Sequence, residues 1–160
     1  MMKLRRATPE DAPRIAEIWE AAWRDGHVGH VPDELVAIRT PESFRSRSAE
    51  RIGAATVAEV DGVIAGFVAL HGDEVEQVFV AREHRGSGVA DALMAEAERQ
   101  LRDAGHPTAW LAVVGGNARA RRFYERLGWT DAGPFDYLAD GVDRQIRVAA
   151  HRYVKRVNSP

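Results

Sequence analysis

Residues 74–90 read EVEQVFVAREHRGSGVA, in which an alternating segment, a loop with two glycines and the start of a helical segment follow one another. Alternation over 74–80 predicts a β-strand. The glycines at 86 and 88 let backbone N–H groups turn inward, and the helix predicted over 88–103 adds its unpaired first-turn N–H groups and the positive end of its dipole. Residues 85–90 are therefore a candidate pyrophosphate site, although an ordinary turn into a helix has the same pattern.

A second pattern lies downstream, where Asn117 is followed by FYERLGW at 123–129. The segment predicts a helix from Asn117, as N-cap, to Leu127, with Gly128 as its stop. Asn117 and Tyr124 are two helical turns apart and so lie on one face. By itself this segment favours a capped helix whose aromatic residues belong to the core.

The rest of the chain predicts an α/β domain over residues 1–160. We expect a first strand over 2–6, a helix from Thr8-Pro9 that breaks between Gly26 and Pro32, and a helix over 41–51, with 33–38 helical or irregular. Strands are expected over 55–60, 63–70, 108–114, 134–138 and 144–154, the first two joined by an Asp61-Gly62 hairpin turn. This order is typical of helices packed on a mixed sheet.

Composition excludes several classes of function. The 160 residues carry a net charge of −2 and 45% hydrophobic residues, as in a soluble protein without a general affinity for nucleic acid. The absence of cysteine excludes disulfides, a thiol nucleophile and thiolate-bound metals, and no Gly-Lys-Ser/Thr step forms a phosphate loop. Without a signal peptide or an apolar stretch of membrane-spanning length, the expectation is a cytoplasmic protein with no membrane partner.

Two further ligand classes are disfavoured. A dinucleotide-binding fingerprint needs a third glycine, G-x-G-x-x-G, where this chain has Asp91, which weakens a Rossmann-type oxidoreductase reading. His27 and His30 lie near Asp33, but nothing else supports a metal, and none is predicted.

Taken together, the strand over 74–80, Arg85-x-x-Gly88-x-Ala90 and the later Asn117 and Tyr124 resemble the GCN5-related N-acetyltransferase (GNAT) superfamily over residues 54–130. The resemblance implies a mixed, mostly antiparallel sheet flanked by helices on both faces. It also implies acetyl-CoA as co-substrate, and a splay between the strands ending at 80 and 114 that admits it.

The resemblance assigns residues to acetyl-CoA. Backbone amides around the loop would hold the pyrophosphate, main-chain groups of the preceding strand would pair with the pantetheine arm, and an asparagine would contact the pantetheine. In this chain the loop is Arg85, Gly86, Ser87, Gly88, Val89 and Ala90, the strand residues are Val78 and Val80, and the asparagine is Asn117.

It also implies the catalytic groups. The Val78 N–H would face the acetyl carbonyl, and Tyr124 would protonate the departing thiolate. Glu76 would be the base, directly or through water, because a strand residue two before Val78 points to the same side; Glu74 is the second candidate. Trp23, His27 and His30 are candidate substrate contacts, with core packing or a loop position as the alternatives.

The predicted function is acetyl transfer to a primary amine of a small or amino-acid-like molecule, directly within a ternary complex. Peptide or protein N-termini are an alternative acceptor. A GNAT-like module that binds acyl-CoA without turnover is the alternative from another class, and a homodimer is possible.

Overall fold

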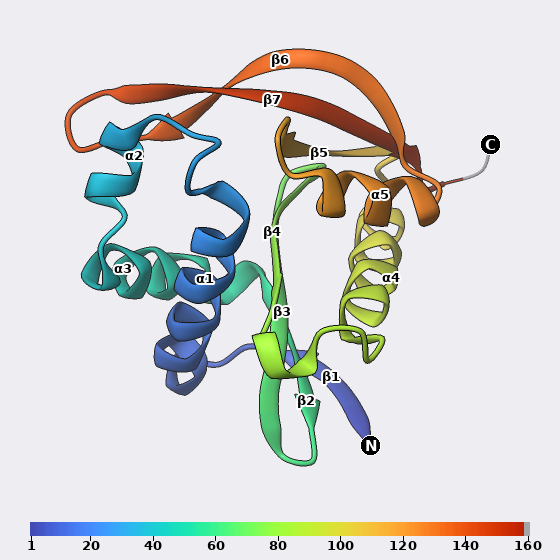
Figure 1. Ribbon diagram of the computed structural model, residues 1–160. Coiled ribbons are helices and arrows are strands. Elements are labelled where there is room, and N and C mark those ends of the chain that lie inside the picture. Colours follow the sequence, from blue (N-terminus) through green and yellow to red (C-terminus); the bar gives the residue numbers. More distant parts are fainter. Residues whose placement is uncertain (159–160) are drawn as a thin grey trace.

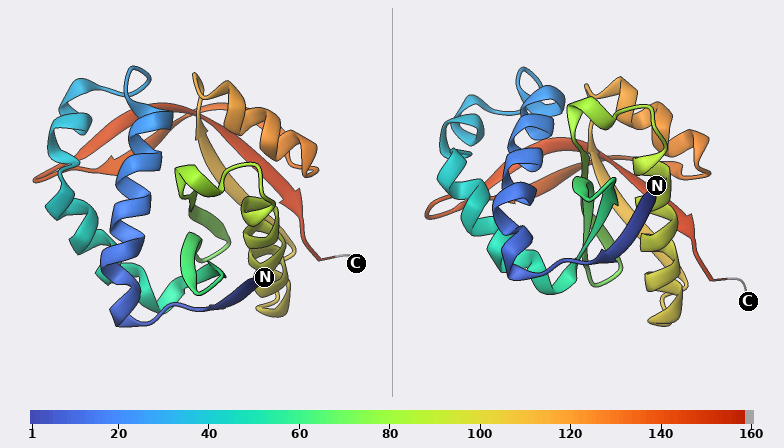
Figure 2. Two further views of the ribbon diagram at one scale, coloured as in Figure 1. Left: turned by 60° about the horizontal axis from the view of Figure 1, so that its bottom comes forward. Right: turned by 90° about the horizontal axis from the view of Figure 1, so that it is seen from below.

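The computed structural model describes residues 1–158, which form a seven-stranded sheet with helices on both faces (Figures 1 and 2). The strands are β1 (Met2–Arg6), β2 (Ala55–Val60), β3 (Val63–His71), β4 (Glu74–Val80), β5 (Thr108–Val114), β6 (Thr130–Asp140) and β7 (Gln145–Arg156). The helices are α1 (Ala12–His27), α2 (Asp33–Ile38), α3 (Pro41–Arg51), α4 (Val89–Asp103) and α5 (Ala118–Arg126).

The sheet order is β1-β2-β3-β4-β5-β7-β6. The β4–β5 pair is parallel and the other pairs are antiparallel, as expected for the mixed sheet. The Asp61-Gly62 turn has positive φ at both residues (53° and 82°), the conformation of the tight hairpin turn that this dipeptide favours.

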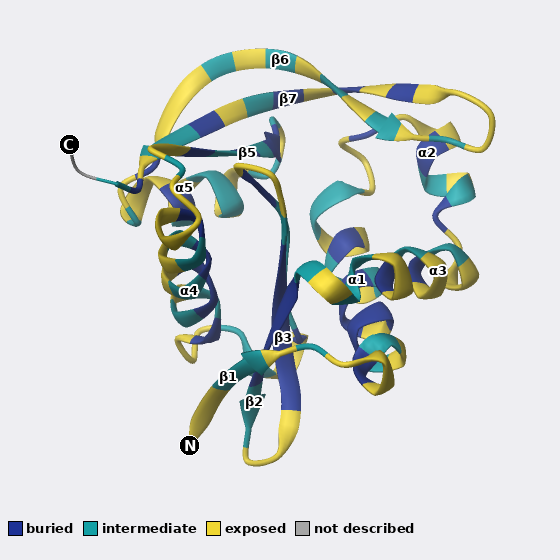
Figure 3. Cartoon of the chain, turned by 180° about the vertical axis from the view of Figure 1, so that it is seen from behind, coloured by how far each residue is buried: buried dark blue, intermediate teal, exposed yellow. Residues whose placement is uncertain are grey.

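Two apolar clusters hold the helices to the sheet. On one face, fully buried Trp19 of α1 packs against Phe44 of α3 and Phe67 of β3, with ring centroids 5.5 and 5.8 Å away. On the other face, Leu93 and Met94 of α4 lie in a cluster with residues of β3 and β5. Figure 3 shows the buried positions running along β3 and along the inward sides of α1 and α4.

The first helix begins later than its sequence signal predicts. Residues Pro9–Asp11 form a 3₁₀ turn, and α1 begins at Ala12. Pro13 has no N–H to give to the carbonyl of Pro9, so the Ala12 N–H takes that carbonyl instead and the chain tightens by one residue. The Asp11 carboxylate accepts from the Thr8 N–H at 2.7 Å and fixes the entry to the turn.

The last two strands are longer than predicted. The strand predicted over 134–138 begins at Thr130 instead, because pairing with β7 continues from Pro134↔His151 to Asp131↔Tyr153 across a register shift. A local irregularity in one strand does not end pairing when the partner strand runs on. The segment 33–38, which the sequence left open, is the short helix α2.

Candidate active site

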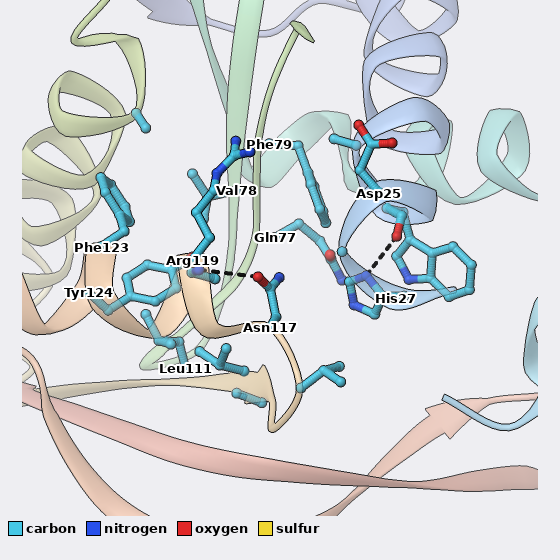
Figure 4. A pocket seen from close by; sticks show the side chains of 18 of the residues that line it. Asp25, His27, Gln77, Val78, Phe79, Leu111, Asn117, Arg119, Phe123 and Tyr124 are labelled. Carbon is cyan, nitrogen blue, oxygen red and sulfur yellow. Dashed lines mark hydrogen bonds between the residues drawn. The ribbon is translucent and has the colours of Figure 1, made fainter. Parts of the chain in front are cut away.

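A cavity of about 810 Å³ opens where β4 and β5 separate (Figure 4). The two strands are paired at Glu74↔Trp110 and at no later position among residues 1–158, so they diverge toward Val80 and Val114. This is the predicted splay. The C-terminal end of α1, the loop before α4, and α5 supply the remaining walls.

The divergence leaves backbone groups of β4 without a strand partner. The Ala81 N–H donates to Ala65 O at 2.7 Å, and the register from there aligns Phe79 with Phe67. Because bonded and non-bonded residues alternate in an antiparallel pair, Val78 and Val80 direct their N–H and C=O groups away from β3, toward the gap. An extended ligand in the gap can therefore pair with β4 as a strand would.

The loop between β4 and α4 presents a cluster of free N–H groups. Gly86 and Gly88 have φ of 77° and 87°, in the left-handed region, and Gly88 is the N-cap of α4. Among residues 1–158, no backbone carbonyl accepts from the N–H groups of residues 86–91. Free N–H groups at the positive end of a 15-residue helix form a site for an anion.

Two arginines tie this loop to the first helix. Arg82 and Arg85 both bind Asp25, near the end of α1, with nitrogen–oxygen distances of 2.8 and 2.7 Å. The hydrogen bond from Arg85 is the main reason that the pKa of Asp25 lies below its usual value. The ion pairs fix the loop on one side of the cavity, and both guanidinium groups already have a carboxylate partner.

Asn117 connects the other two walls. Its Oδ1 accepts from the Ala120 N–H at 3.1 Å and caps α5, as the sequence predicts. Its Nδ2 faces α1 at Gly26, where a Cβ would lie only 2.8 Å away. The side chain lines the cavity while it serves as a cap, so the two readings of Asn117 are compatible.

Tyr124 extends from α5 into the cavity (Figure 4). Burial raises its pKa well above the ordinary value, so the hydroxyl keeps its proton at neutral pH. Among the described residues, no group forms a hydrogen bond with that hydroxyl, which leaves its proton available to a ligand. The ring is held at 5.1 Å from Phe123, centroid to centroid.

Glu76 does not lie where simple alternation predicts. The β3–β4 register jumps from Ala69↔Gln77 to Leu70↔Val75, so Glu76 is the extra residue of a β-bulge. The expectation that Glu76 and Val78 share a side of the strand is therefore wrong. Val78 packs toward the α4 face, whereas the Glu76 carboxylate lies on the α3 face and accepts from Arg51 Nε at 2.7 Å.

Glu74 has a different environment at the start of the gap. Its side chain is buried, and burial raises its pKa. The hydroxyl of Tyr137, from β6, donates to Glu74 Oε2 at 3.1 Å. Both glutamates line the cavity, one held by a cation and the other by a neutral hydroxyl.

The three candidate substrate residues are in different settings. Trp23 is buried, stacks on His27 with centroids 4.7 Å apart, and lines the cavity. His27 also lines it; burial lowers its pKa to about 4, and its Nδ1 lies 2.8 Å from Trp23 O (Figure 4). His30 is exposed, and its ring lies against Gly116 outside the cavity lining.

Most of the sequence-predicted site residues do line one cavity. They are Glu76, Val78, Val80, Arg85, Gly86, Gly88, Ala90, Asn117, Tyr124, Trp23 and His27. Ser87 and Val89 do not line it; the Ser87 hydroxyl donates to His84 O, and the Val89 side chain is buried against α4's apolar cluster.

The sequence reasoning missed Arg39 and Arg47, which enter the cavity from the end of α2 and from α3, and Tyr137 of β6. For 41–51 the sequence predicts a helix but no site residue. The two arginines reach the cavity through packing between segments that are distant in the sequence, and a local sequence pattern cannot predict such packing.

Residues 1–158 contain no helix long and apolar enough to cross a membrane. Within the same residues, no three His, Asp or Glu side chains gather as a metal-ligand set.

Comparison with known proteins places this geometry in a family. Residues 12–129 match the model of the acetyltransferase (GNAT) family. Streptothricin acetyltransferase of Streptomyces lavendulae is 30% identical over 143 residues, which cover 86% of this chain and 68% of that protein.

Two solved structures share the fold. One is the PaiA N-acetyltransferase of Thermoplasma acidophilum in complex with coenzyme A, with a TM-score of 0.73 and 16% identity over 98% of this chain and 99% of that one. The other is YncA, a putative acetyltransferase from Salmonella typhimurium with acetyl-CoA. Its TM-score is 0.73, and it is 18% identical over 100% of this chain and 96% of that one. The family match over most of the chain, with the splayed strands and the glycine loop, identifies the protein as a member of the acetyltransferase (GNAT) family, whose N-acetyltransferases use acetyl-CoA as co-substrate.

Proposed function

We propose that this N-acetyltransferase moves the acetyl group of acetyl-CoA to a primary amine of a small molecule, directly within a ternary complex. The observation that supports this most is the continuity of the cavity. One space runs from the glycine loop, past the free edge of β4 and Tyr124, to Glu76 and the helices α1 to α3. Donor and acceptor can therefore be bound at once, and no cysteine is present to carry the acetyl group between them.

The donor is proposed to bind along the α4 and α5 side. The free N–H groups of residues 86–90 hold the pyrophosphate, and the gap-facing backbone groups of Val78 and Val80 pair with the amides of the pantetheine arm. Asn117 Nδ2 contacts the same arm. Arg119 and Arg122 of α5 also line this side and add positive charge near the phosphates.

Three groups of the chain are proposed to carry the chemistry. Glu76 accepts a proton from the substrate ammonium, through one water, on Oε2, the oxygen that Arg51 does not bind. The Val78 N–H stabilises the negative charge that develops on the acetyl oxygen as the amine nitrogen bonds to the carbonyl carbon. Tyr124 donates its proton to the sulfur as the carbon–sulfur bond breaks. The acylated nitrogen then loses its second proton to the Tyr124 phenolate, and Glu76 passes its proton to water, so the products are the N-acetyl amine, CoA and one proton.

The position of Glu76 on the bulge supports this division of roles. The bulge turns Glu76 toward α3 while Val78 keeps its backbone in the gap, so the base and the donor edge lie on different sides of β4. An amine that enters from the α1–α3 side meets the base first and the acetyl group next.

The test is a turnover screen that follows CoA release from acetyl-CoA with an array of amines, amino acids and short peptides. Small amines or amino acids should be acetylated, and initial rates at varied concentrations of both substrates should give intersecting reciprocal plots. Parallel plots would contradict direct transfer. Turnover of peptides alone would favour the peptide acceptor, and tight acetyl-CoA binding without turnover of any amine would favour a non-catalytic acyl-CoA sensor. A homodimer stays a prediction, which light scattering checks.

A further inference from the structure

Two guanidinium groups on the acceptor side of the cavity have no anionic partner among residues 1–158. Arg39, at the end of α2, is 5% exposed, and Arg47 of α3 is partly buried with its Nη1 fully buried. Neither guanidinium donates a hydrogen bond to any other described residue. Both line the cavity. By contrast, Arg51, one turn after Arg47 on α3, binds Glu76.

The neighbouring acids do not neutralise this pair. Glu76 is already bound to Arg51, and Glu74 accepts a hydrogen bond from Tyr137 and forms no ion pair with any described residue. Asp140 of β6 is exposed and acts on the two arginines only at a distance.

His27 contributes no charge at this end of the cavity, since its pKa of about 4 leaves the ring neutral at pH 7. The α1–α3 end of the cavity therefore holds two positive charges without a contact ion.

Such an arrangement is costly in the free protein. A charge taken out of water without a partner destabilises the fold, and desolvation together with the neighbouring charges of Arg39 and Arg51 lowers the pKa of Arg47 to about 10. The cation–π contact with the Trp19 ring, whose centroid lies 4.5 Å from the Arg47 guanidinium, offsets only part of this destabilisation. Unpaired charges in a cavity are the setting in which an anionic ligand gains most from binding.

We propose that Arg39 and Arg47 bind a carboxylate of the acceptor, so that the substrate is an amino acid rather than a simple amine. The proposal rests on the acetyltransferase function proposed above and names its substrate class. The amine of such a substrate lies toward Glu76 on β4, and its carboxylate lies toward α2 and α3. A guanidinium suits a carboxylate because its N–H groups match the two oxygens. Leu35 and Val148 are apolar residues of the same cavity lining.

The donor phosphates are not the anion in question. The free N–H groups assigned to them lie at the start of α4, on the opposite face of the sheet from α3 (Figure 1). The N–H groups before α4 and the guanidinium groups of Arg39 and Arg47 therefore lie in different parts of one cavity.

The test compares each of the twenty amino acids with its carboxamide, which keeps the amine and side chain and loses the negative charge. With acetyl-CoA saturating, the best amino acid should exceed its amide in kcat/KM by at least tenfold, as for hydrogen bonds to a charged group. Arg47→Met should lower this ratio toward one, and Arg47→Lys should keep part of it. Arg45→Met, on an exposed position of the same helix, is the matched control and should leave the ratio unchanged.

The same variants separate this proposal from the proposed function. If no amine at all is acetylated, the transfer reaction fails, and the carboxylate site is judged by calorimetry in the presence of CoA, with the N-acetyl amino acids against their N-acetyl amides. Equal turnover or binding of acid and amide, no binding of any N-acetyl amino acid, or a ratio that Arg47→Met does not change, overturns the carboxylate site. Arg47→Met should melt at or above the wild-type temperature, since it removes an unpaired buried charge; Arg39→Met is the second variant if it does not fold.

Discussion

Replacing Gly88 by glutamate should weaken acetyl-CoA binding while it costs the fold little. Gly88 has φ of 87° and ψ of 2°, a left-handed conformation that costs a residue with a side chain about 1–2 kcal/mol. No atom lies within 4 Å of the position of a Cβ there, so no clash adds to this cost. The carboxylate of the new glutamate, at the N-terminus of α4, stabilises the helix by about 0.3–1 kcal/mol. The net loss of stability should be about 1 kcal/mol, or roughly 2–4 °C in Tm.

The same carboxylate that interacts favourably with the helix N-terminus has an unfavourable electrostatic effect on acetyl-CoA binding. The glutamate carboxylate occupies the N–H cluster that is proposed to hold the pyrophosphate and repels it. Calorimetry should show a rise in the Kd of acetyl-CoA of more than tenfold, or ~1.4 kcal/mol.

Gly105, just after the other end of α4, provides a matched control. Its φ is 89°, and it also has open space around a Cβ. Gly105→Glu carries the same backbone strain, but its carboxylate meets the negative end of the dipole, so it should lose more stability, about 2 kcal/mol. It should nevertheless bind acetyl-CoA with wild-type affinity. Equal Kd values for wild type and a folded Gly88→Glu, or equal weakening in the two variants, would refute the reasoning.

Three further predictions follow from individual side chains. Tyr124→Phe removes one hydroxyl that has no partner in the described residues, and should lower kcat by ~10²–10⁴-fold with little change in the Kd of acetyl-CoA, because the proton is needed in the transition state; a kcat within twofold of wild type would assign the protonation to water. Glu76→Gln should lower kcat/KM at neutral pH and recover much of the loss at high pH, where free amine is abundant, with acetyl-CoA affinity unchanged; if the pH profile stays wild-type, Glu74→Gln is the variant to measure next. The Arg5 guanidinium lowers the pKa of Asp11 from 3.8 to about 2, so this carboxylate stabilises the fold above about pH 4 and loses that contribution as the pH falls toward 2. Asp11→Asn should therefore cost about 2 kcal/mol in urea unfolding at pH 7 and almost nothing at pH 2, and an equal cost at both values would exclude the linkage.

Local chemistry made much of the fold predictable. Asp61-Gly62 between two apolar runs, Asn117 before a helical segment and Gly105 after one are signals that act over two to four residues, and the structure places a hairpin, a cap and a helix end at these positions. The strand over 74–80 and the loop at 85–90 were located in the same way.

The side chains around Glu76 were harder to predict, because a bulge is decided by the partner strand. Period-2 alternation put Glu76 beside Val78, and only the register against Ala69 and Leu70 shows that one residue is extra. Thr8 and Pro9 do start a helical turn as predicted, but the α-helix proper begins only at Ala12. The reason is again a residue further along the chain, because Pro13 cannot donate to the Pro9 carbonyl and the Ala12 N–H bonds to it instead.

The acceptor side was the least predictable part of the site. No local pattern predicts that Arg39 and Arg47 enter the cavity. The Arg47 guanidinium packs on the ring of Trp19, and Tyr137 of β6 lines the same cavity, so residues from distant parts of the chain form this end of the site. Donor recognition relies on backbone groups in short motifs and can be predicted locally, whereas acceptor recognition relies on side chains gathered by tertiary packing.

The separation of β4 from β5 also bears on aggregation. A sheet normally has unpaired strands only at its outer ends, here β1 and β6, and such edges are where other chains add strands. This sheet has two more unpaired edges in its middle, at Val78–Val80 and along β5, flanked by α1, α4 and α5. A polypeptide strand that added here would have to fit the side chains of both its faces between these helices, whereas a slender chain with few side groups would not. The helices thus leave an unpaired strand edge open to a ligand, while they limit the access of strands from other copies of the protein.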